Sequence, residues 1–301
     1  LEGRPFTGVR YLDARGRRSA EGSFPAGPGL AVRRVVLHDA LLRRAAALGV
    51  RFREDRVERI RVDPDEVRVE DVRTRWLVGA DGLHSRVRAA LGVALPPRHP
   101  PRFGIRRHFA APPWTDRVEV YLAGGAEAYV TPLEGGIVGV AILFEGHGRF
   151  DELLARFPAV ADRLAGAPAV TDARGAGPFE QRVRRRSVGR VALVGDAAGY
   201  LDALTGEGVA LGIATGRVAV ECMRSGHPEE YEARYRALTR RYALLTNALR
   251  GVVRVRALHA PLLALARRAP WAFDAALATL ADLRERPAEI APAWSRASTE
   301  A

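Results

Sequence analysis

The sequence predicts an α/β protein in which a nucleotide-type domain is interrupted by an antiparallel sheet and followed by helices. Three observations predict this organisation. Buried strands end in glycine and aspartate at two places about 115 residues apart, at Gly79–Gly82 and at Gly195–Asp196. Between them, after Pro96, apolar and polar residues alternate with period two, which is typical of antiparallel strands. After Gly208 the apolar residues recur at helical spacing.

The first 95 residues predict strands and one helix. Residues 8–18 predict a strand that ends in a turn, and we expect residues 1–29 to join the sheet of the inserted domain. Residues 50–55 and 57–62 are typical of short strands. Residues 30–95 are interpreted as the first part of the nucleotide-type domain. A helix within this part is predicted by apolar residues at helical spacing and a closing glycine, namely Leu37, Leu41, Ala45, Leu48 and Gly49.

The rest of the chain divides into three further regions. Residues 96–181 begin with a proline-rich linker and predict an antiparallel sheet plus a helix that is kinked or split at Pro158. Residues 182–224 return to the buried, β-branched style of the first part, with the strand Val191–Val194. Residues 225–301 predict a helical region that ends in a polar tail. The fold class is therefore a discontinuous, Rossmann-like α/β domain with an inserted sheet and a C-terminal helical region.

Composition narrows the classes of function. Of the 301 residues, 47 are basic and 35 acidic, which gives a net charge of +12. All the basic residues are arginine and no run of them is interleaved with aromatic residues, so we do not expect nucleic-acid binding. Cys222 is the only cysteine, which favours a cytoplasmic setting. No apolar segment approaches the length of a membrane span. The histidines have no partners at metal-ligand spacing, so no metal site is expected.

The first glycine–aspartate motif is "VGADGLHSRVR", residues 78–88. Asp81 at the end of the strand is placed either to orient the backbone or to accept a sugar or polyol hydroxyl. Gly82 permits a close backbone approach, and Ser85 is expected to cap the helix that follows. Arg88 is placed to meet a pyrophosphate with two parallel hydrogen bonds. A corner capped for stability alone is the alternative interpretation.

The second motif is "GDAAGYLDALTGEG", residues 195–208. Asp196 ends a buried strand, where a carboxylate is suited to a polyol hydroxyl, and the small residues after it keep the chain narrow beside a large ligand. A helix opens at Gly208, so its first backbone N–H groups are free to face an anionic atom. The residues expected to contact a ligand here are Gly195, Asp196, Ala197, Ala198, Gly206, Glu207, Gly208 and Val209.

Together the two motifs resemble the internal FAD-binding motifs of the p-hydroxybenzoate hydroxylase superfamily, which includes the geranylgeranyl reductases. Residues 30–92 and 190–216 carry the resemblance, and Arg34 matches an arginine that lies near the flavin. The resemblance implies that the divided domain binds FAD, with Asp196 on the ribitol chain and the helix start at Gly208 beside the flavin ring. It implies an oxidoreductase that acts on a small apolar organic substrate, with NADH or NADPH as the electron donor.

That superfamily begins with a βαβ unit carrying G-x-G-x-x-G, and no stretch of this chain matches it. The chain also begins with Leu1 rather than with methionine. We therefore expect an N-terminally truncated chain that lacks the first βαβ unit and holds FAD weakly by itself. The alternative is a binding protein or a non-catalytic remnant that has lost FAD.

Departures from the family pattern leave two chemistries open. Where aromatic hydroxylases commonly carry histidine, proline and asparagine, this chain has Gly199, Ala203 and Ala210, which is closer to the reductase branch. The function is therefore either hydride reduction of a double bond or hydroxylation with NAD(P)H and O2. Tyr129 and Thr131 lie on a strand expected to face the flavin and are candidate substrate contacts. The alternative for Tyr129 is an aromatic residue in the core or on the surface.

The helices from Asn247 to Leu283 carry both aliphatic residues and arginines. One interpretation is peripheral contact with an anionic membrane surface, through an apolar face bordered by basic side chains. The other is that the helices pack across the cofactor domain with their arginines in solvent. The arginines concerned are Arg250, Arg254, Arg256, Arg267 and Arg268.

Overall fold

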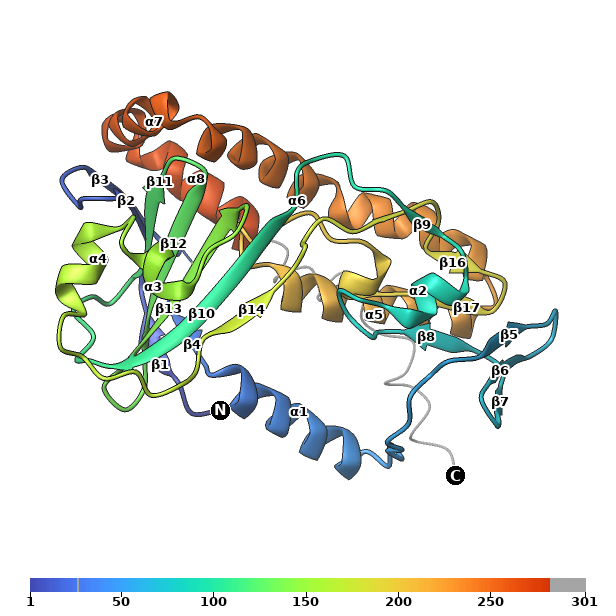
Figure 1. Cartoon of the computed structure of the whole chain (residues 1–301). Coiled ribbons are helices and arrows are strands. Elements are labelled where there is room, and N and C mark those ends of the chain that lie inside the picture. The colour runs from blue at the N-terminus through green and yellow to red at the C-terminus, as the bar shows by residue number, and fades with distance from the viewer. Residues whose placement is uncertain (26, 282–301) are drawn as a thin grey trace.

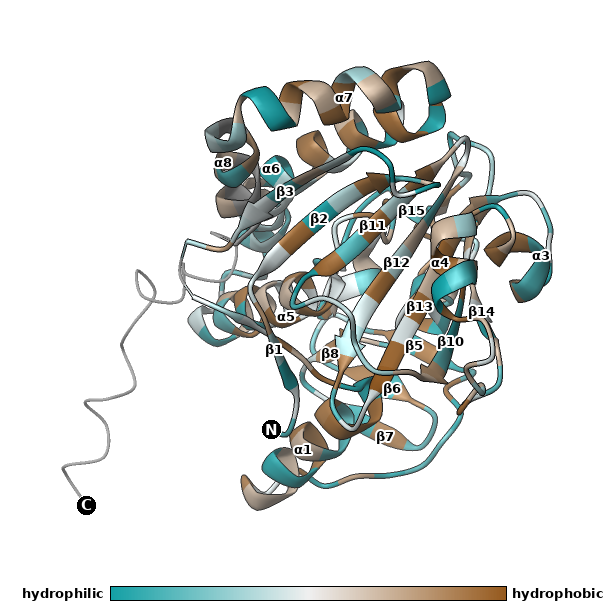
Figure 2. Ribbon diagram, turned by 90° about the vertical axis from the view of Figure 1, so that its left-hand side faces the viewer, coloured by the Kyte–Doolittle hydropathy of each residue, from teal (hydrophilic) through white to brown (hydrophobic). Residues whose placement is uncertain are grey.

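The computed structural model describes residues 1–25 and 27–281. Its largest element is a seven-stranded sheet in the order β14-β10-β13-β12-β11-β2-β3, in which only β11 and β2 pair in parallel. Figure 2 shows these strands side by side, and β2 and β3 extend the sheet of the inserted region. The strands are β2 (Gly8–Asp13), β3 (Ser19–Ser23), β10 (Arg102–Ala110), β11 (Val118–Ala123), β12 (Ala126–Leu133), β13 (Ile137–Glu145) and β14 (Arg174–Ala176).

One face of this sheet forms a large hydrophobic core. Val130 of β12 and Ile142 of β13 point into it and are almost fully buried. Helices α3 (Phe150–Leu154) and α4 (Pro158–Arg163) cover this face, with Phe157 buried between them. The helix expected here is split because Pro158 lacks a backbone N–H and is accommodated only in a first helical turn.

The second unit is a small sheet that carries both glycine–aspartate motifs. Strand β17 (Val191–Leu193) pairs in parallel with β8 (Leu77–Gly79) and antiparallel with β16 (Ser187–Val188). Helix α2 (Arg86–Ala90) follows β8. A 3-10 turn (Gly195–Ala198) and then helix α5 (Gly208–Ser225) follow β17, and α5 packs its buried side on this sheet.

The remaining strands form small sheets, and one expected strand is absent. Residues 50–55 have no strand structure, and no described strand pairs with them. Helix α1 (Arg34–Ala47) forms as expected but buries none of its residues. It lies apart from both larger sheets in Figure 1. The small sheets are β1–β4 (Arg4–Phe6 and Gly29–Ala31), β5–β6–β7 (Ile60–Val62, Val67–Val69 and Val72–Thr74) and β9–β15 (Ala94–Leu95 and Arg182–Val183).

A helical region follows α5, with a 3-10 turn (Pro228–Glu230) and then α6 (Tyr231–Arg254), α7 (Arg256–Arg268) and α8 (Pro270–Ala281). Helix α6 runs from α5 to the large sheet and joins the two units (Figure 1). Of the arginines expected on a basic helix face, Arg250 is buried, while Arg254 is exposed and pairs with Glu145 at 3.0 Å. The predictions for residues 282–301 fall outside the described residues. In the part that is described, no helix is long and apolar enough to cross a membrane.

Candidate functional site

The parallel pairing of β8 and β17 brings the ends of the two motifs together. Gly79 lies opposite Leu193, and the next backbone N–H, that of Val194, donates to the carbonyl oxygen of Gly79 at 3.0 Å. Because both strands run in the same direction, Asp81 and Asp196 emerge at the same edge of the sheet. Ligands of open α/β sheets bind at this carboxyl edge.

Asp81 orients the backbone, which is one of the two roles expected for it. Its Oδ2 accepts hydrogen bonds from the N–H groups of Arg86 (2.7 Å) and Val87 (3.1 Å). The Ser85 hydroxyl accepts from the N–H of Arg88 at 2.9 Å, so two side chains cap the short helix α2. Gly82 has open space where a side chain would stand. The corner is therefore rigid and leaves room for a ligand beside Gly82.

Arg88 joins the two motifs instead of pointing out of the site. Its NH1 donates to the carbonyl oxygens of Asp196 and Ala197, both at 3.2 Å. Its NH2 donates to Leu83 O (2.6 Å) and to Gln181 Oε1 (2.8 Å). A contact from both of these nitrogens to a pyrophosphate would break those bonds. The geometry thus gives Arg88 a positioning role, and its expected pyrophosphate contact stays a prediction.

Gly195 turns the chain where β17 ends. Its φ of +55° is in the left-handed region that disfavours side chains, and a Cβ there would lie 3.3 Å from the Cα of Gly212. Its N–H donates to the Thr215 hydroxyl of α5 at 2.9 Å. Ala197 and Ala198 are fully buried in the core beneath the turn. Close packing of α5 against this turn fixes where Asp196 points.

Asp196 is half-buried, and its carboxylate accepts no hydrogen bond from the described residues. Burial raises its pKa, while the positive charges of Arg34 and Arg88 oppose the rise. A Cβ on Gly208 would lie 3.8 Å from Asp196 Oδ1, so the carboxylate stands beside the start of α5. Arg34, Asp196 and Gly208 are thus brought together from three distant parts of the sequence.

The start of α5 offers free backbone donors. The first helical bond runs from the N–H of Leu211 to Glu207 O at 2.9 Å, which leaves the N–H groups of Gly208 and Val209 without helical acceptors. No acidic residue lies in the first turn to neutralise the positive end of the helix. Glu207 is the buried N-cap residue, and Gly206 lies in the turn before it. This helix end fits an anionic ring edge.

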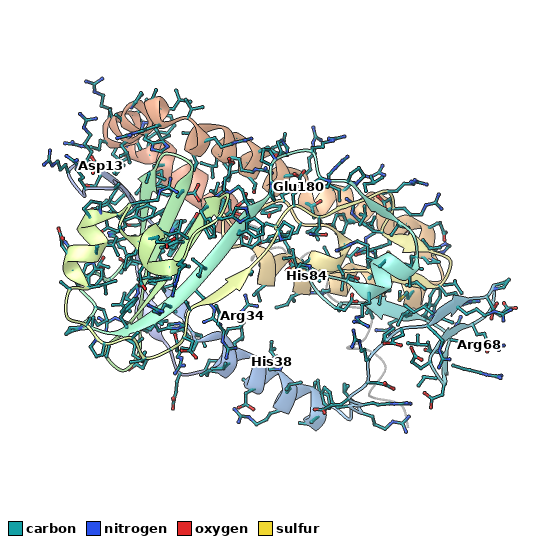
Figure 3. All side chains as sticks on the ribbon, viewed as in Figure 1. Asp13, Arg34, His38, Arg68, His84 and Glu180 are labelled. Atoms are coloured by element: carbon teal, nitrogen blue, oxygen red, sulfur yellow. The ribbon has the colours of Figure 1, made fainter. Side chains whose placement is uncertain are left out.

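The junction of β4 and α1 lies between this edge and the large sheet. Arg34 acts on the pKa of Asp196. Burial of the imidazole lowers the pKa of His108, and the charges of Arg106 and of Arg33, which precedes Arg34, lower it further. His108 of β10 and Thr131 of β12 both pair with Gly139, so they lie in one row on one face of the sheet. Figure 3 shows Arg34 between the sheet and the segment that carries His84.

Tyr129 holds the loop before α5. Its hydroxyl donates to the carbonyl oxygen of Leu204 at 2.9 Å, and its ring packs with Val120 and Leu204. Burial raises its pKa well above the ordinary value. Tyr129 therefore anchors the loop before α5 to the sheet, and its candidate substrate contact stays a prediction. Thr131 is half-buried two residues further along the strand, and its substrate contact stays a prediction.

A buried ion network lies behind the same loop and was not predicted. Arg102 NH2 is 2.5 Å from Glu127 Oε2, and Arg102 Nε is 3.5 Å from Asp202 Oδ2. Arg250 Nε of α6 is 3.6 Å from the same Asp202 oxygen. The four side chains are at most 6% exposed. The Tyr242 hydroxyl also donates to Asp202 O at 3.2 Å, so the loop is held by the sheet and by α6 at once.

The residues of this network occur singly in the sequence. Arg102 follows a proline-rich linker, Glu127 interrupts an apolar strand and Arg250 lies on a helix with many other arginines. Asp202 lies inside the second motif and Glu127 lies two residues before Tyr129, but neither was itself predicted as a site residue. A carboxylate in a strand that is otherwise apolar was the one available sign of a buried partner.

Comparison with known proteins supports a flavin site. Residues 40–135 match the family model described as an FAD binding domain. Rifampicin monooxygenase from Streptomyces venezuelae is 30% identical over 236 residues, which are 68% of this chain and 49% of that protein. The chain therefore spans about half the length of this curated relative.

Solved structures match over most of the chain. HpxO from Klebsiella pneumoniae, complexed with FAD and uric acid, has a TM-score of 0.74 at 20% identity and covers 92% of this chain and 81% of its own. The flavin-dependent brominase Bmp2 has a TM-score of 0.75 at 16% identity, and the match covers 95% of this chain and 82% of Bmp2. The flavin-dependent halogenase CmlS has a TM-score of 0.71 at 20% identity, and the match covers 81% of this chain and 52% of CmlS. The chain thus has the mixed α/β fold of flavin-dependent monooxygenases and halogenases.

The residues at the strand edge fit FAD. Asp196 would offer an unpartnered carboxylate to a hydroxyl of the ribitol chain, and the free N–H groups at the start of α5 would offer donors to the ring. The glycines keep the backbone accessible beside both. Among the described residues, no group of three or more His, Cys, Asp or Glu side chains is placed to hold a metal ion.

Asp196→Ala is expected to weaken FAD binding by about 1–3 kcal/mol, because one hydrogen bond from the ribitol to a half-buried carboxylate is lost. The measurement is the dissociation constant from quenching of flavin fluorescence. Asp162→Ala, at an exposed aspartate of α4, is the matched control and should leave the constant unchanged. Unaltered affinity in Asp196→Ala would remove this aspartate from the cofactor site.

The stability of the fold is expected to depend on the protonation of Glu127. Burial raises the pKa of Glu127 from 4.5 to about 7, against the opposing charge of Arg102. The folded state therefore binds more protons than the unfolded state between these values, and the free energy of unfolding falls as the pH rises through this range, by up to about 3 kcal/mol. Urea unfolding at pH 5 and pH 8 should show this fall in the native protein and not in Glu127→Gln.

Glu134→Gln, in the exposed turn between β12 and β13, is the control and should keep the fall. The assignment to Glu127 is wrong if Glu127→Gln shows the same dependence on pH as the native protein.

Proposed function

We propose that the protein is an FAD-dependent oxidoreductase that acts on a small organic substrate. The observation that carries the proposal is the meeting of Asp196 with the first turn of α5 at the carboxyl edge of β8 and β17. The match of residues 40–135 to an FAD binding domain and the similarity to rifampicin monooxygenase support it. When bound, FAD supplies the electron transfer, and the protein supplies position and electrostatics.

Each part of the site has a task in this proposal. Asp196 accepts a hydrogen bond from a hydroxyl of the ribitol chain and so fixes how deeply the cofactor lies in the site. The N–H groups of Gly208 and Val209 donate to the ring and favour negative charge on it. The substrate lies against the face of the large sheet that carries His108 and Thr131, where burial and the neighbouring charges lower the pKa of His108 and keep the ring neutral near pH 7.

Oxygen-dependent hydroxylation is the favoured reaction. The curated relative with 30% identity is a monooxygenase, and the family match covers the first motif of the site, from Asp81 to Arg88. NADH or NADPH is proposed as the electron donor, because a hydroxylation of this kind consumes two electrons from outside the substrate. The substrate is proposed to be apolar over most of its surface.

Reduction of a double bond is a second candidate, and Gly199 favours it. Its φ of +123° is a conformation that side chains rarely adopt, and a Cβ there would lie 3.3 Å from the carbonyl oxygen of Gln181. Histidine, which the aromatic hydroxylases commonly carry here, would be strained in this conformation. With this backbone, the position suits glycine and disfavours the histidine of the hydroxylase pattern.

The protein in its full natural length is expected to purify with the absorption bands of oxidised flavin, which NADH or NADPH should bleach. If the reaction is hydroxylation, oxygen should be consumed in proportion to the product formed. Reduction predicts that the bleached flavin is reoxidised by an alkene in the absence of oxygen. A protein that takes up no flavin after incubation with FAD would contradict the proposal and favour a binding protein without FAD.

A further inference from the structure

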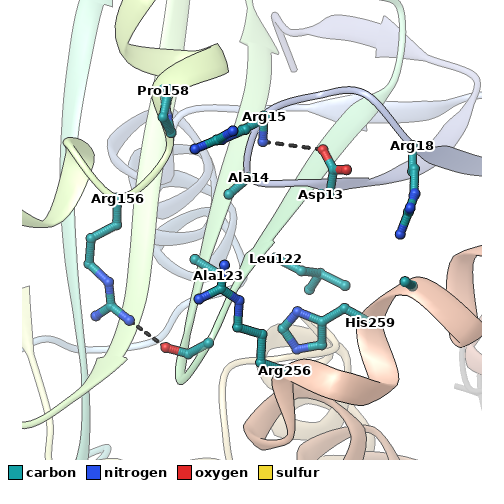
Figure 4. A pocket seen from close by; sticks show the side chains of 12 residues that line it. Asp13, Ala14, Arg15, Arg18, Leu122, Ala123, Arg156, Pro158, Arg256 and His259 are labelled. Atoms are coloured by element: carbon teal, nitrogen blue, oxygen red, sulfur yellow. Dashed lines mark hydrogen bonds between the residues drawn. The ribbon is translucent and has the colours of Figure 1, made fainter.

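A cavity lies at the end of the large sheet, away from the proposed cofactor site. It measures about 510 Å³ and is bordered by the turn between β2 and β3, the junction of α3 with α4 and the first turn of α7 (Figure 4). In Figure 3, Asp13 marks this end of the molecule, while Arg34 and His84 lie near its middle. The volume is in the range of small-molecule sites.

The lining of this cavity carries far more positive than negative charge. Arg15, Arg18, Arg156 and Arg256 line it, and Asp13 is its one carboxylate. Asp13 Oδ1 accepts hydrogen bonds from backbone N–H groups, including that of Arg15 at 3.2 Å, so this carboxylate organises the turn. Among the described residues, no carboxylate pairs with Arg15, Arg18 or Arg256. These guanidinium groups are available to an anion.

His259 adds a buried polar group to the same wall. Its side chain lines the cavity from α7, and the residue is only 6% exposed (Figure 4). Its Nε2 donates to the carbonyl oxygen of Val253 at 2.8 Å, and its Nδ1 has no partner among the described residues. Helix α7 begins at Arg256 with no acidic residue in its first turn, so the positive end of the helix borders the cavity too.

An apolar groove of about 340 Å³ adjoins the cavity. It shares Arg18 and Ala260 with the cavity and continues along α7 past Pro261 and Ala264 to Arg267. A ligand that fills both spaces needs a compact anionic head and an aliphatic tail. Several guanidinium groups around one head favour phosphate, whose oxygens accept paired hydrogen bonds from arginine.

We propose that the cavity and the groove together bind an aliphatic phosphate or diphosphate ester, with the head among the arginines and the chain along α7. The site is separate from the flavin site, so it does not depend on the proposed oxidoreductase function. The same chemistry occurs in a free ester and in the headgroup of an anionic lipid, and the experiment separates these sources.

The test is calorimetric titration of the protein with decyl phosphate below its micelle concentration. The double variant Arg18→Gln/Arg256→Gln should weaken binding at least tenfold. Arg224→Gln/Arg240→Gln removes the same charge from exposed positions on α5 and α6 and should change binding less than twofold. Methyl phosphate, which lacks the tail, should bind the native protein at least tenfold more weakly than decyl phosphate.

Vesicles of phosphatidylcholine with and without phosphatidic acid identify the source. If the native protein co-sediments with vesicles that contain phosphatidic acid and the cavity variant does not, the site exists and its ligand is a lipid headgroup. If the protein binds decyl phosphate but does not co-sediment with the vesicles, the site exists and its ligand is a free ester. The proposal is overturned if no probe binds saturably, or if the cavity and control variants weaken binding equally.

Discussion

The position of Asp202 between two buried arginines is the constraint on which the site depends. Arg102 reaches this carboxylate from the large sheet and Arg250 reaches it from α6, while Arg102 also pairs with Glu127. Removing one partner of such a group leaves a buried charge unpaired, at a cost of about 3–5 kcal/mol. The loop before α5 is therefore fixed from behind, and with it the turn from which the free N–H groups of Gly208 and Val209 point.

The site is assembled from short pieces whose side chains mostly hold backbone. Arg88 donates to the turn after β17, Thr215 accepts from Gly195, and Tyr129 donates to the loop. Few side chains are left over for a ligand, and Asp196 is the clearest of them. This division of tasks suits a cofactor that performs the chemistry itself, because such a protein needs an accurate cradle more than a set of acids and bases.

Local pattern was enough to predict most elements of the fold. The parallel strands that end at Asp81 and Asp196 and the helix that begins at Gly208 follow from residues close together in the sequence. The strand expected at residues 50–55 does not form, since a strand needs a partner that no local pattern reveals. The direction of the Arg88 side chain and the network around Asp202 depend on residues that only the fold brings together.

The network around Asp202 is expected to position the proposed cofactor site without touching the cofactor. The sharpest test is the FAD dissociation constant of Asp202→Asn, measured on protein whose folded state is verified by near-ultraviolet circular dichroism. The FAD affinity should be at least tenfold weaker than that of the native protein, because the start of α5 is no longer held in place. Native FAD affinity in a folded variant would show that the network does not position the site.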